Sequence, residues 1–222
     1  EIGSGLVGSE MCIETGEKGD LYFYVLYTAV KAAKDGETIT LLGDQTVSKQ
    51  IVVDKSLTID GNGYRVKLAK PVDNVNLTNI AHGVFQFSGN DKTAVMKNLT
   101  FKDIDIDSVL IRAYNSGNNS CLTVDGCTFD NVKALNIVRA SSSDAMNCKL
   151  VVTNSTFKNC IATSNGIIQI DSSKTTNATD NEIKNNDFIG NKVGPADNVA
   201  GIYLSAPATV QNNYFDGNTT TA

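Results

Sequence analysis

The sequence has no Trp, a single His, only three Pro, and no long apolar run. A membrane-spanning helix needs roughly 18 consecutive apolar residues, and no segment approaches that length. The five Cys are too few and too irregularly spaced for a disulfide framework, and no C-x-x-C pair offers zinc ligands. These absences exclude a membrane-spanning helix, a small disulfide-rich scaffold and a zinc finger.

The chain also lacks a basic run. It contains 19 Lys and Arg against 24 Asp and Glu, which gives a net charge of −5. This balance argues against nucleic acid or an anionic membrane surface as a partner. Apolar residues make up 41% of the chain, too many for a disordered protein, so we expect a folded domain.

What the sequence does contain is a repeat. An aliphatic residue is followed by Gly or Asn two places later and by an aromatic residue five places later. The six copies are Ile59/Gly61/Tyr64, Met96/Asn98/Phe101, Val124/Gly126/Phe129, Val152/Asn154/Phe157, Ile183/Asn185/Phe188 and Val210/Asn212/Phe215. Successive copies lie 27 to 37 residues apart, a period typical of units that stack to bury a shared core.

Two structural ladders follow from this stacking. The Gly and Asn positions suit a bend in the chain, so Asn98, Asn154, Asn185 and Asn212 are expected to form one turn column with Gly61 and Gly126. The aromatic positions predict an inward stack of Phe101, Phe129, Phe157, Phe188 and Phe215.

Further short apolar strands recur between the copies, for example over 109–113 and 136–140, which makes three strands per repeat. The one convincing helical pattern has Leu26, Ala29, Val30 and Ala33 on one face. We expect residues 1–36 to form a strand and a helix that caps residues 37–222.

The run from Lys31 to Gly63 resembles the opening of right-handed parallel β-helix domains of the pectin-lyase-like superfamily, as found in bacterial cell-surface, adhesin-like proteins. The resemblance implies an all-β fold, a right-handed single-stranded parallel β-helix with three sheets and six to seven coils. It says little about function, because one fold hosts many activities.

Ligand binding is predicted at Arg112 and Arg139, which occupy the same place in adjacent repeats, and at Asp171, which is expected to continue the same outward column in the next repeat. Two stacked guanidinium groups could hold a carboxylate or sulfate of a glycan. Alternatively, Asp171 pairs with Arg139 and Arg112 extends into solvent.

A Ca²⁺ site is a second possibility, because Asp103 and Asp105 alternate with apolar residues and place oxygen ligands on one strand face. The alternative is a solvated acidic face in which Lys133 of the next repeat pairs with Asp105. No other cofactor is predicted.

Enzymes of the superfamily that cleave polyuronates use Asp-bound calcium with an Arg base, or clustered Asp with His-Gly and Arg-x-Lys elements. Arg65 to Lys67 and His82-Gly83 look like the last two elements, but they occur in reverse order and lack the preceding Asp pair. We therefore interpret this match as chance and assign no catalytic residue.

Two further features of the sequence are a cysteine pair and two longer repeats. Cys121 and Cys148 lie one repeat apart, and stacking would place them about 4.8 Å apart, so they could form a disulfide or remain free thiols. Residues 69–83 and 172–181 lengthen two repeats and are expected to form loops on one face.

We expect a non-catalytic module of a secreted or surface-anchored bacterial protein, located outside the cell, that binds a glycan or a host surface. The start of the sequence lacks both Met and the basic residues of a signal peptide, which suggests a processed segment. The isolated domain is expected to be a monomer. A lyase or hydrolase acting on an acidic polysaccharide, and a spacer without a ligand, are the alternatives.

Overall fold

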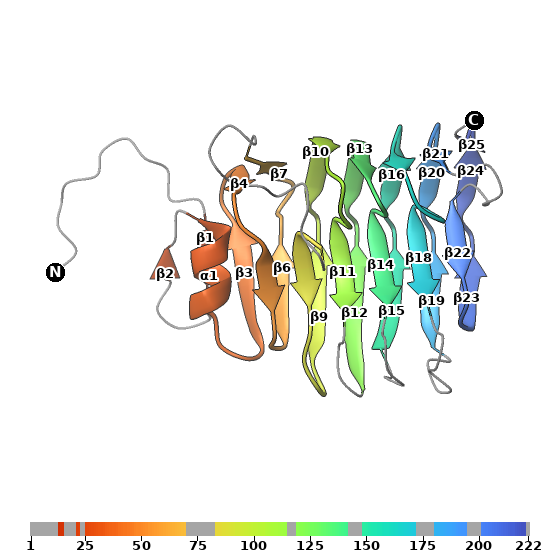
Figure 1. The fold of residues 1–222 in the computed structure, drawn as a ribbon. Coiled ribbons are helices and arrows are strands. Elements are labelled where there is room, and N and C mark those ends of the chain that lie inside the picture. Colours follow the sequence, from red (N-terminus) through yellow and green to blue (C-terminus); the bar gives the residue numbers. More distant parts are fainter. Residues whose placement is uncertain are drawn as a thin grey trace, which may run out of the picture.

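The computed structural model describes residues 13–15, 21–22, 25–69, 83–114, 119–141, 148–171, 180–194 and 201–220. It confirms an all-β architecture in which three parallel sheets form a β-solenoid with one helix. Figure 1 shows the coils stacked side by side from the N-terminal helix to the last strands. No helix in these ranges is long and apolar enough to cross a membrane.

Each sheet takes one strand from every coil. Sheet A contains, in spatial order, β2 (Leu21–Tyr22), β1 (Ile13–Thr15), β3 (Glu37–Leu41), β6 (Leu57–Asp60), β9 (Thr93–Lys97), β12 (Ser120–Asp125), β15 (Cys148–Thr153), β19 (Asn181–Lys184) and β23 (Ala208–Gln211). Sheet C contains β5 (Ile51–Val53), β8 (Phe85–Phe87), β11 (Ile111–Tyr114), β14 (Val138–Ser141), β18 (Ile168–Asp171) and β22 (Ile202–Leu204).

Sheet B lies between them in chain order. Its main path contains β4 (Gln45–Val47), β7 (Arg65–Leu68), β10 (Thr100–Asp105), β13 (Thr128–Ala134), β16 (Thr156–Lys158), β20 (Asp187–Ile189) and β24 (Tyr214–Asp216). The short strands β17 (Ile161–Ala162), β21 (Lys192–Val193) and β25 (Thr219–Thr220) continue this sheet beyond a second bend.

The full repeat, with an aromatic rung in sheet B, extends over about four turns from β9 to β22, whereas the sequence predicts six to seven coils. The earlier strands β3 to β8 lack the aromatic rung. In register with Phe101 stand Val66 and then Gln45, and Tyr64 lies outside the column and is 37% exposed. Tyr64 matches the spacing of the repeat but not its place in the structure, because the turn after β6 is longer than the later turns.

Two inward columns, from sheets A and B, form much of the core. The aliphatic residues pair in register across sheet A, from Ile59 through Met96, Val124, Val152 and Ile183 to Val210. The phenylalanines stack in sheet B with ring centroids 4.8 to 5.2 Å apart and nearly parallel planes. Both columns are fully buried except in the last coil, where Val210 and Phe215 are 41% and 47% exposed.

Left-handed backbone conformations define the turn column between sheets A and B. Asn98, Gly126, Asn154, Asn185 and Asn212 all have φ between 52° and 59°. Gly61 does not share this conformation. A Cβ there would lie 2.4 Å from the carbonyl oxygen of Asn98, so glycine is required by the close approach of the next coil.

Buried polar ladders lie just inside the two bends, a feature that the sequence analysis missed. Asn186 accepts a hydrogen bond from the amide of Ser155 and donates one to the carbonyl of Val152. Asn191 likewise accepts from the amide of Cys160 and donates to the carbonyl of Phe157. These side chains satisfy backbone groups that the bends would otherwise leave buried and unpaired.

Cysteine replaces asparagine in the earlier coils of the same ladders. The thiol of Cys127 donates to the carbonyl of Met96, and that of Cys160 donates to the carbonyl of Phe129. Burial raises the pKa of both thiols to about 12. They are structural hydrogen-bond donors within the core rather than reactive groups.

Helix α1 (Leu26–Ala32) packs against β4 and β5 at the start of the solenoid. Its apolar face buries Leu26, Ala29 and Val30, as the helical pattern predicts. The ammonium of Lys55 donates to the carbonyls of Val30 and Ala33, which satisfies groups at the C-terminal end of the helix. Strand β1 pairs antiparallel to β3, so the first coil has a partner on its outer edge.

Candidate functional site

The outer face of sheet C presents a row of polar side chains that we call the arginine row: Gln86, Arg112, Arg139, Gln169 and Tyr203. Apolar residues alternate with these along every strand and point into the core. The side chains of Arg112 and Arg139 stand directly opposite each other on β11 and β14. The sequence predicts this pairing because both arginines hold the same place in the repeat.

Asp171 does not occupy the arginine row. It is paired with Ser141, two residues beyond Gln169, which is the true partner of Arg139. The side chain nevertheless reaches Arg139, whose Nε and one Nη donate to the same carboxylate oxygen at 2.8 and 2.5 Å. The sequence-based placement of Asp171 is therefore wrong by two residues along the strand. The ion pair between Asp171 and Arg139 is present.

A chain of hydrogen bonds fixes the Arg139–Asp171 pair. The amide of Gln169 donates to the second carboxylate oxygen of Asp171 at 2.6 Å, and Asn136 donates to the carbonyl oxygen of the Gln169 side chain at 2.9 Å. Gln169 and Asn136 are buried. Arg139 is therefore held in a defined position by groups that belong to the next coil and to the bend before β14.

The described contacts of Arg112 include a hydroxyl and an aromatic ring. Its Nε donates to the hydroxyl of Ser141 at 3.0 Å, and its guanidinium lies 4.4 Å from the ring centroid of Tyr114. Burial is the main cause that lowers the pKa of Arg112, and the charge of Arg139 lowers it further. The surroundings thus disfavour the positive charge on Arg112, although an arginine keeps its proton at neutral pH.

The predicted calcium ligands are placed differently. Asp103 adopts a left-handed conformation with φ 55°, accepts a hydrogen bond from Asn131, and lies 3.2 Å from Arg65. Asp105 pairs with Lys133 at 3.0 Å. Hydrogen bonding from Asn131 is the main cause that lowers the pKa of Asp103. Among the described residues no three His, Cys, Asp or Glu side chains gather as a metal site would require.

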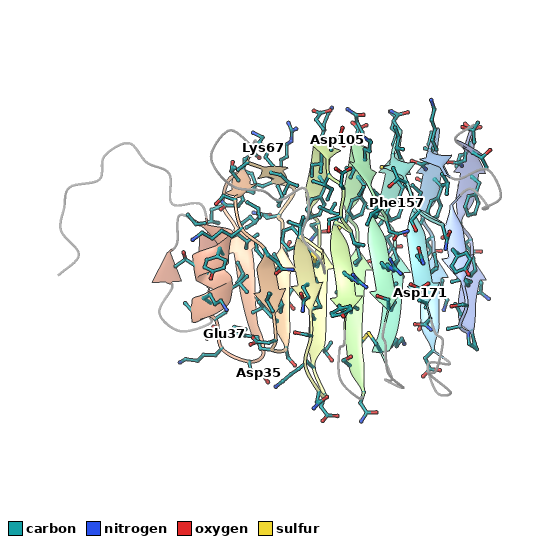
Figure 2. All side chains as sticks on the ribbon, viewed as in Figure 1. Asp35, Glu37, Lys67, Asp105, Phe157 and Asp171 are labelled. Carbon is teal, nitrogen blue, oxygen red and sulfur yellow. The ribbon has the colours of Figure 1, made fainter. Side chains whose placement is uncertain are left out.

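Other charged residues from the sequence analysis form ion pairs on sheet B. Lys67 lies 2.9 Å from Asp44, and Arg65 belongs to the Asp103 pair. Figure 2 shows Lys67 and Asp105 projecting from one edge of the solenoid, whereas Phe157 lies within it. His82 and most of the two predicted insertion loops lie outside the described residues.

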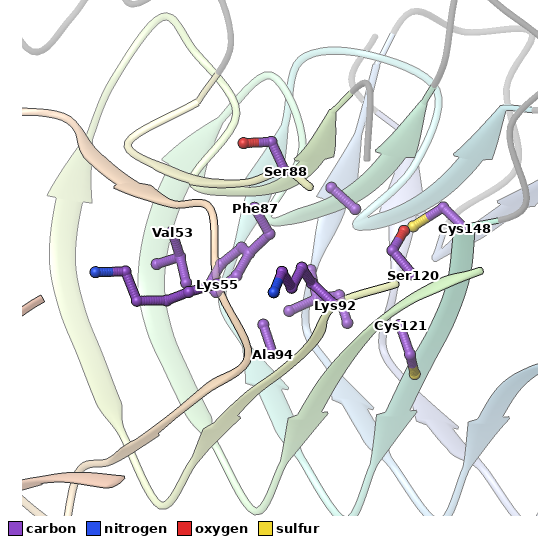
Figure 3. Close-up of a pocket in the computed structure, with 11 residues that line it drawn as sticks. Val53, Lys55, Phe87, Ser88, Lys92, Ala94, Ser120, Cys121 and Cys148 are labelled. Atoms are coloured by element: carbon purple, nitrogen blue, oxygen red, sulfur yellow. The ribbon is translucent and has the colours of Figure 1, made fainter. Parts of the chain in front are cut away.

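A small cavity of about 10 Å³ lies where sheet C leads into sheet A (Figure 3). Lys55, Lys92, Cys121 and Cys148 are among its lining residues. This volume is about that of one water, so the cavity itself cannot hold a larger ligand. Neither thiol forms a disulfide. Cys148 pairs with Ser120 and Cys121 with Lys149, so the disulfide alternative fails because the two cysteines are offset by one residue.

We compared the chain with known protein families, curated proteins and solved structures. No protein-family model, curated protein or solved structure matches the chain. The arginine row is therefore the feature of the chain from which we propose a function.

Proposed function

We propose that the chain is a non-catalytic parallel β-helix module of a secreted or surface-anchored bacterial protein, and that the arginine row binds acidic groups of a glycan. The three-sheet solenoid agrees with the resemblance to the pectin-lyase-like superfamily. The observation that carries the proposal is the direct pairing of Arg112 with Arg139 on an outer sheet face.

The electrostatics of the pair favour an anionic ligand. Like charges placed directly opposite each other on neighbouring strands destabilise a sheet. Asp171 contacts Arg139 through two nitrogens, and the contacts of Arg112 include the hydroxyl of Ser141 and the ring of Tyr114. A carboxylate or sulfate beside Arg112 would offset the repulsion between Arg112 and Arg139. It would also stabilise the charged form of Arg112, which burial disfavours.

Arginine also supplies the right geometry for this ligand. Its planar guanidinium can donate two parallel hydrogen bonds to one carboxylate or sulfate, and the stacking on Tyr114 restricts its orientation. Strand pairing places the two arginine backbones about 4.8 Å apart. An acidic oligosaccharide lying across β11 and β14 could therefore meet both side chains.

The test is calorimetric titration of trigalacturonate, with neutral trigalactose as the matched ligand. We expect trigalacturonate alone to bind, and to bind more weakly at high salt, because the charges are partly exposed. Replacing Arg112 with Ala should weaken binding at least about tenfold, since a hydrogen bond to a charged group contributes about 1.5–3 kcal/mol.

Arg65→Ala is the matched control, because it removes the same charge from sheet B, away from the arginine row. Equal binding of the two ligands, or equal losses in the Arg112 and Arg65 variants, would refute the site. The same samples should be assayed for new reducing ends and unsaturated products. Product formed by the wild type and lost in Arg139→Ala would instead establish the enzyme.

A further inference from the structure

A second hollow lies at the turn from sheet A to sheet B, on residues that the arginine row does not use. We call it the turn hollow. Its volume is about 360 Å³, and it spans three consecutive coils. The lining residues are Asn62, Gly63, Asn98, Thr100, Gly126 and Thr128.

The hollow exists because a glycine interrupts the asparagine column. Gly126 has φ 59°, close to the 54° of Asn98 and the 52° of Asn154 in the neighbouring coils. The backbone φ is therefore nearly the same at all three positions, and Gly126 differs in lacking a side chain. A Cβ on Gly126 would lie 3.0 Å from the side-chain oxygen of Asn98.

The backbone amides around the hollow are already used. Those of Gly63 and Gly126 donate to the carbonyls of Asn98 and Thr153, and those of Thr100 and Thr128 donate to the carbonyls of Tyr64 and Leu99. The amides of the two lining asparagines donate to Asp60 and Asp125. An anion bound by backbone N–H groups is therefore excluded.

Hydroxyl and amide groups remain for a ligand. Thr100 and Thr128 are paired side by side on β10 and β13, and within the described chain their hydroxyls make no hydrogen bond. The side-chain oxygen of Asn98 also accepts no hydrogen bond from a described residue, while its nitrogen donates to Asp60. Hydroxyls can both donate and accept, and the amide oxygen accepts.

The lining residues carry no charge, and Asp60, which contacts two of them, is already neutralised. Asp60 forms an ion pair with Lys97 at 3.0 Å and accepts hydrogen bonds from Asn98 and the amide of Asn62. A calcium ion would require carboxylate ligands that the lining does not supply. The ligand that fits the remaining hydrogen-bonding groups is therefore uncharged and rich in hydroxyl groups.

We propose that the turn hollow binds an uncharged saccharide unit, through the hydroxyls of Thr100 and Thr128 and the amide oxygen of Asn98. This site is independent of the proposed function, because it lies between sheets A and B and takes a neutral ligand. Its binding should be insensitive to salt, and Arg112→Ala should leave it unchanged.

The decisive variant is Gly126→Asn. It restores the asparagine of the column at a φ that asparagine adopts in the coils on either side, so the fold should persist while the hollow is filled. Gly190→Asn is the matched control. Gly190 has φ 62°, and its Cβ would also lie 3.0 Å from an asparagine oxygen, that of Asn159, but it does not line the hollow.

The probes are cellohexaose, maltohexaose and mannohexaose, each titrated into the labelled protein and followed by NMR. At least one should shift the Thr100 and Thr128 signals, and Gly126→Asn should abolish these shifts while Gly190→Asn retains them. The Thr100→Val and Thr128→Val changes, which keep the side-chain shape, should each weaken binding several-fold.

Three results would overturn the site. They are the absence of binding by all three probes, binding that survives Gly126→Asn, and equal shifts on addition of Ca²⁺ alone. Failure of these titrations leaves the trigalacturonate experiment unaffected, because that ligand is tested through Arg112.

Discussion

Truncation of the central phenylalanine, Phe129→Ala, is the sharpest test of the core. The side chain is fully buried and stacks on Phe101 and Phe157, with centroids 5.2 and 4.8 Å away. Removing a buried phenylalanine costs about 3–5 kcal/mol in the free energy of unfolding. Of this, each stacked ring contributes about 0.5–1.5 kcal/mol beyond its buried area.

Two further variants separate the burial from the stacking. Phe129→Leu keeps most of the apolar volume but loses both ring contacts, so its cost should be about 1–3 kcal/mol. Phe215→Ala removes the same side chain at the end of the column, where it is 47% exposed and stacks on one ring. Its cost should be clearly smaller than that of Phe129→Ala.

The measurement is urea denaturation followed by far-ultraviolet circular dichroism. Hydrogen exchange on the same variants would show whether the loss is confined to coils near the substitution, as expected when units contact only their neighbours. A cost below about 1 kcal/mol for Phe129→Ala, or equal costs at Phe129 and Phe215, would show that the stack is not the centre of the core.

Three more predictions concern the buried ladders. Asn191→Ala should cost about 2–5 kcal/mol, because it leaves the amide of Cys160 and the carbonyl of Phe157 buried and unpaired. Asn191→Cys should cost less, since a thiol fills this role one coil earlier, and equal costs in urea denaturation would refute that equivalence. Cys127 and Cys160 should resist a thiol reagent at pH 8 until the protein unfolds, because their pKa of about 12 leaves almost no thiolate. Their protons are lost from the unfolded chain near pH 9, so the thiols should lower stability as pH rises from about 9 to about 12, and Cys127→Ser should flatten that decline.

The repeat could be predicted from the sequence because its spacing is visible without knowledge of the register. Phe129 and Phe157 share one place in successive copies, and strand pairing puts them opposite each other. Tyr64 matches the same spacing but lies outside the column, because its turn contains both Asn62 and Gly63 in left-handed conformations. The spacing in the sequence alone does not show how many residues a turn contains.

The site was harder to predict for the same reason. The pairing of Arg112 with Arg139 follows from equal positions in equal repeats, but Asp171 was placed opposite Arg139 when Gln169 stands there. The inward asparagines carried a signal, since Asn186 and Asn191 each directly follow a residue in a left-handed bend. That signal becomes visible only once the bends are located.

The direction of strand pairing has a mechanical consequence. Neighbouring coils are joined by hydrogen bonds that run along the solenoid axis, while α1 and the last strands lie at opposite ends of it (Figure 1). A force that separates the two ends therefore loads one layer of hydrogen bonds at a time and peels the coils in succession. Stretching should give a series of small, similar force peaks. The peaks should be higher for the coils in which the rings from Phe101 to Phe188 stack on one another.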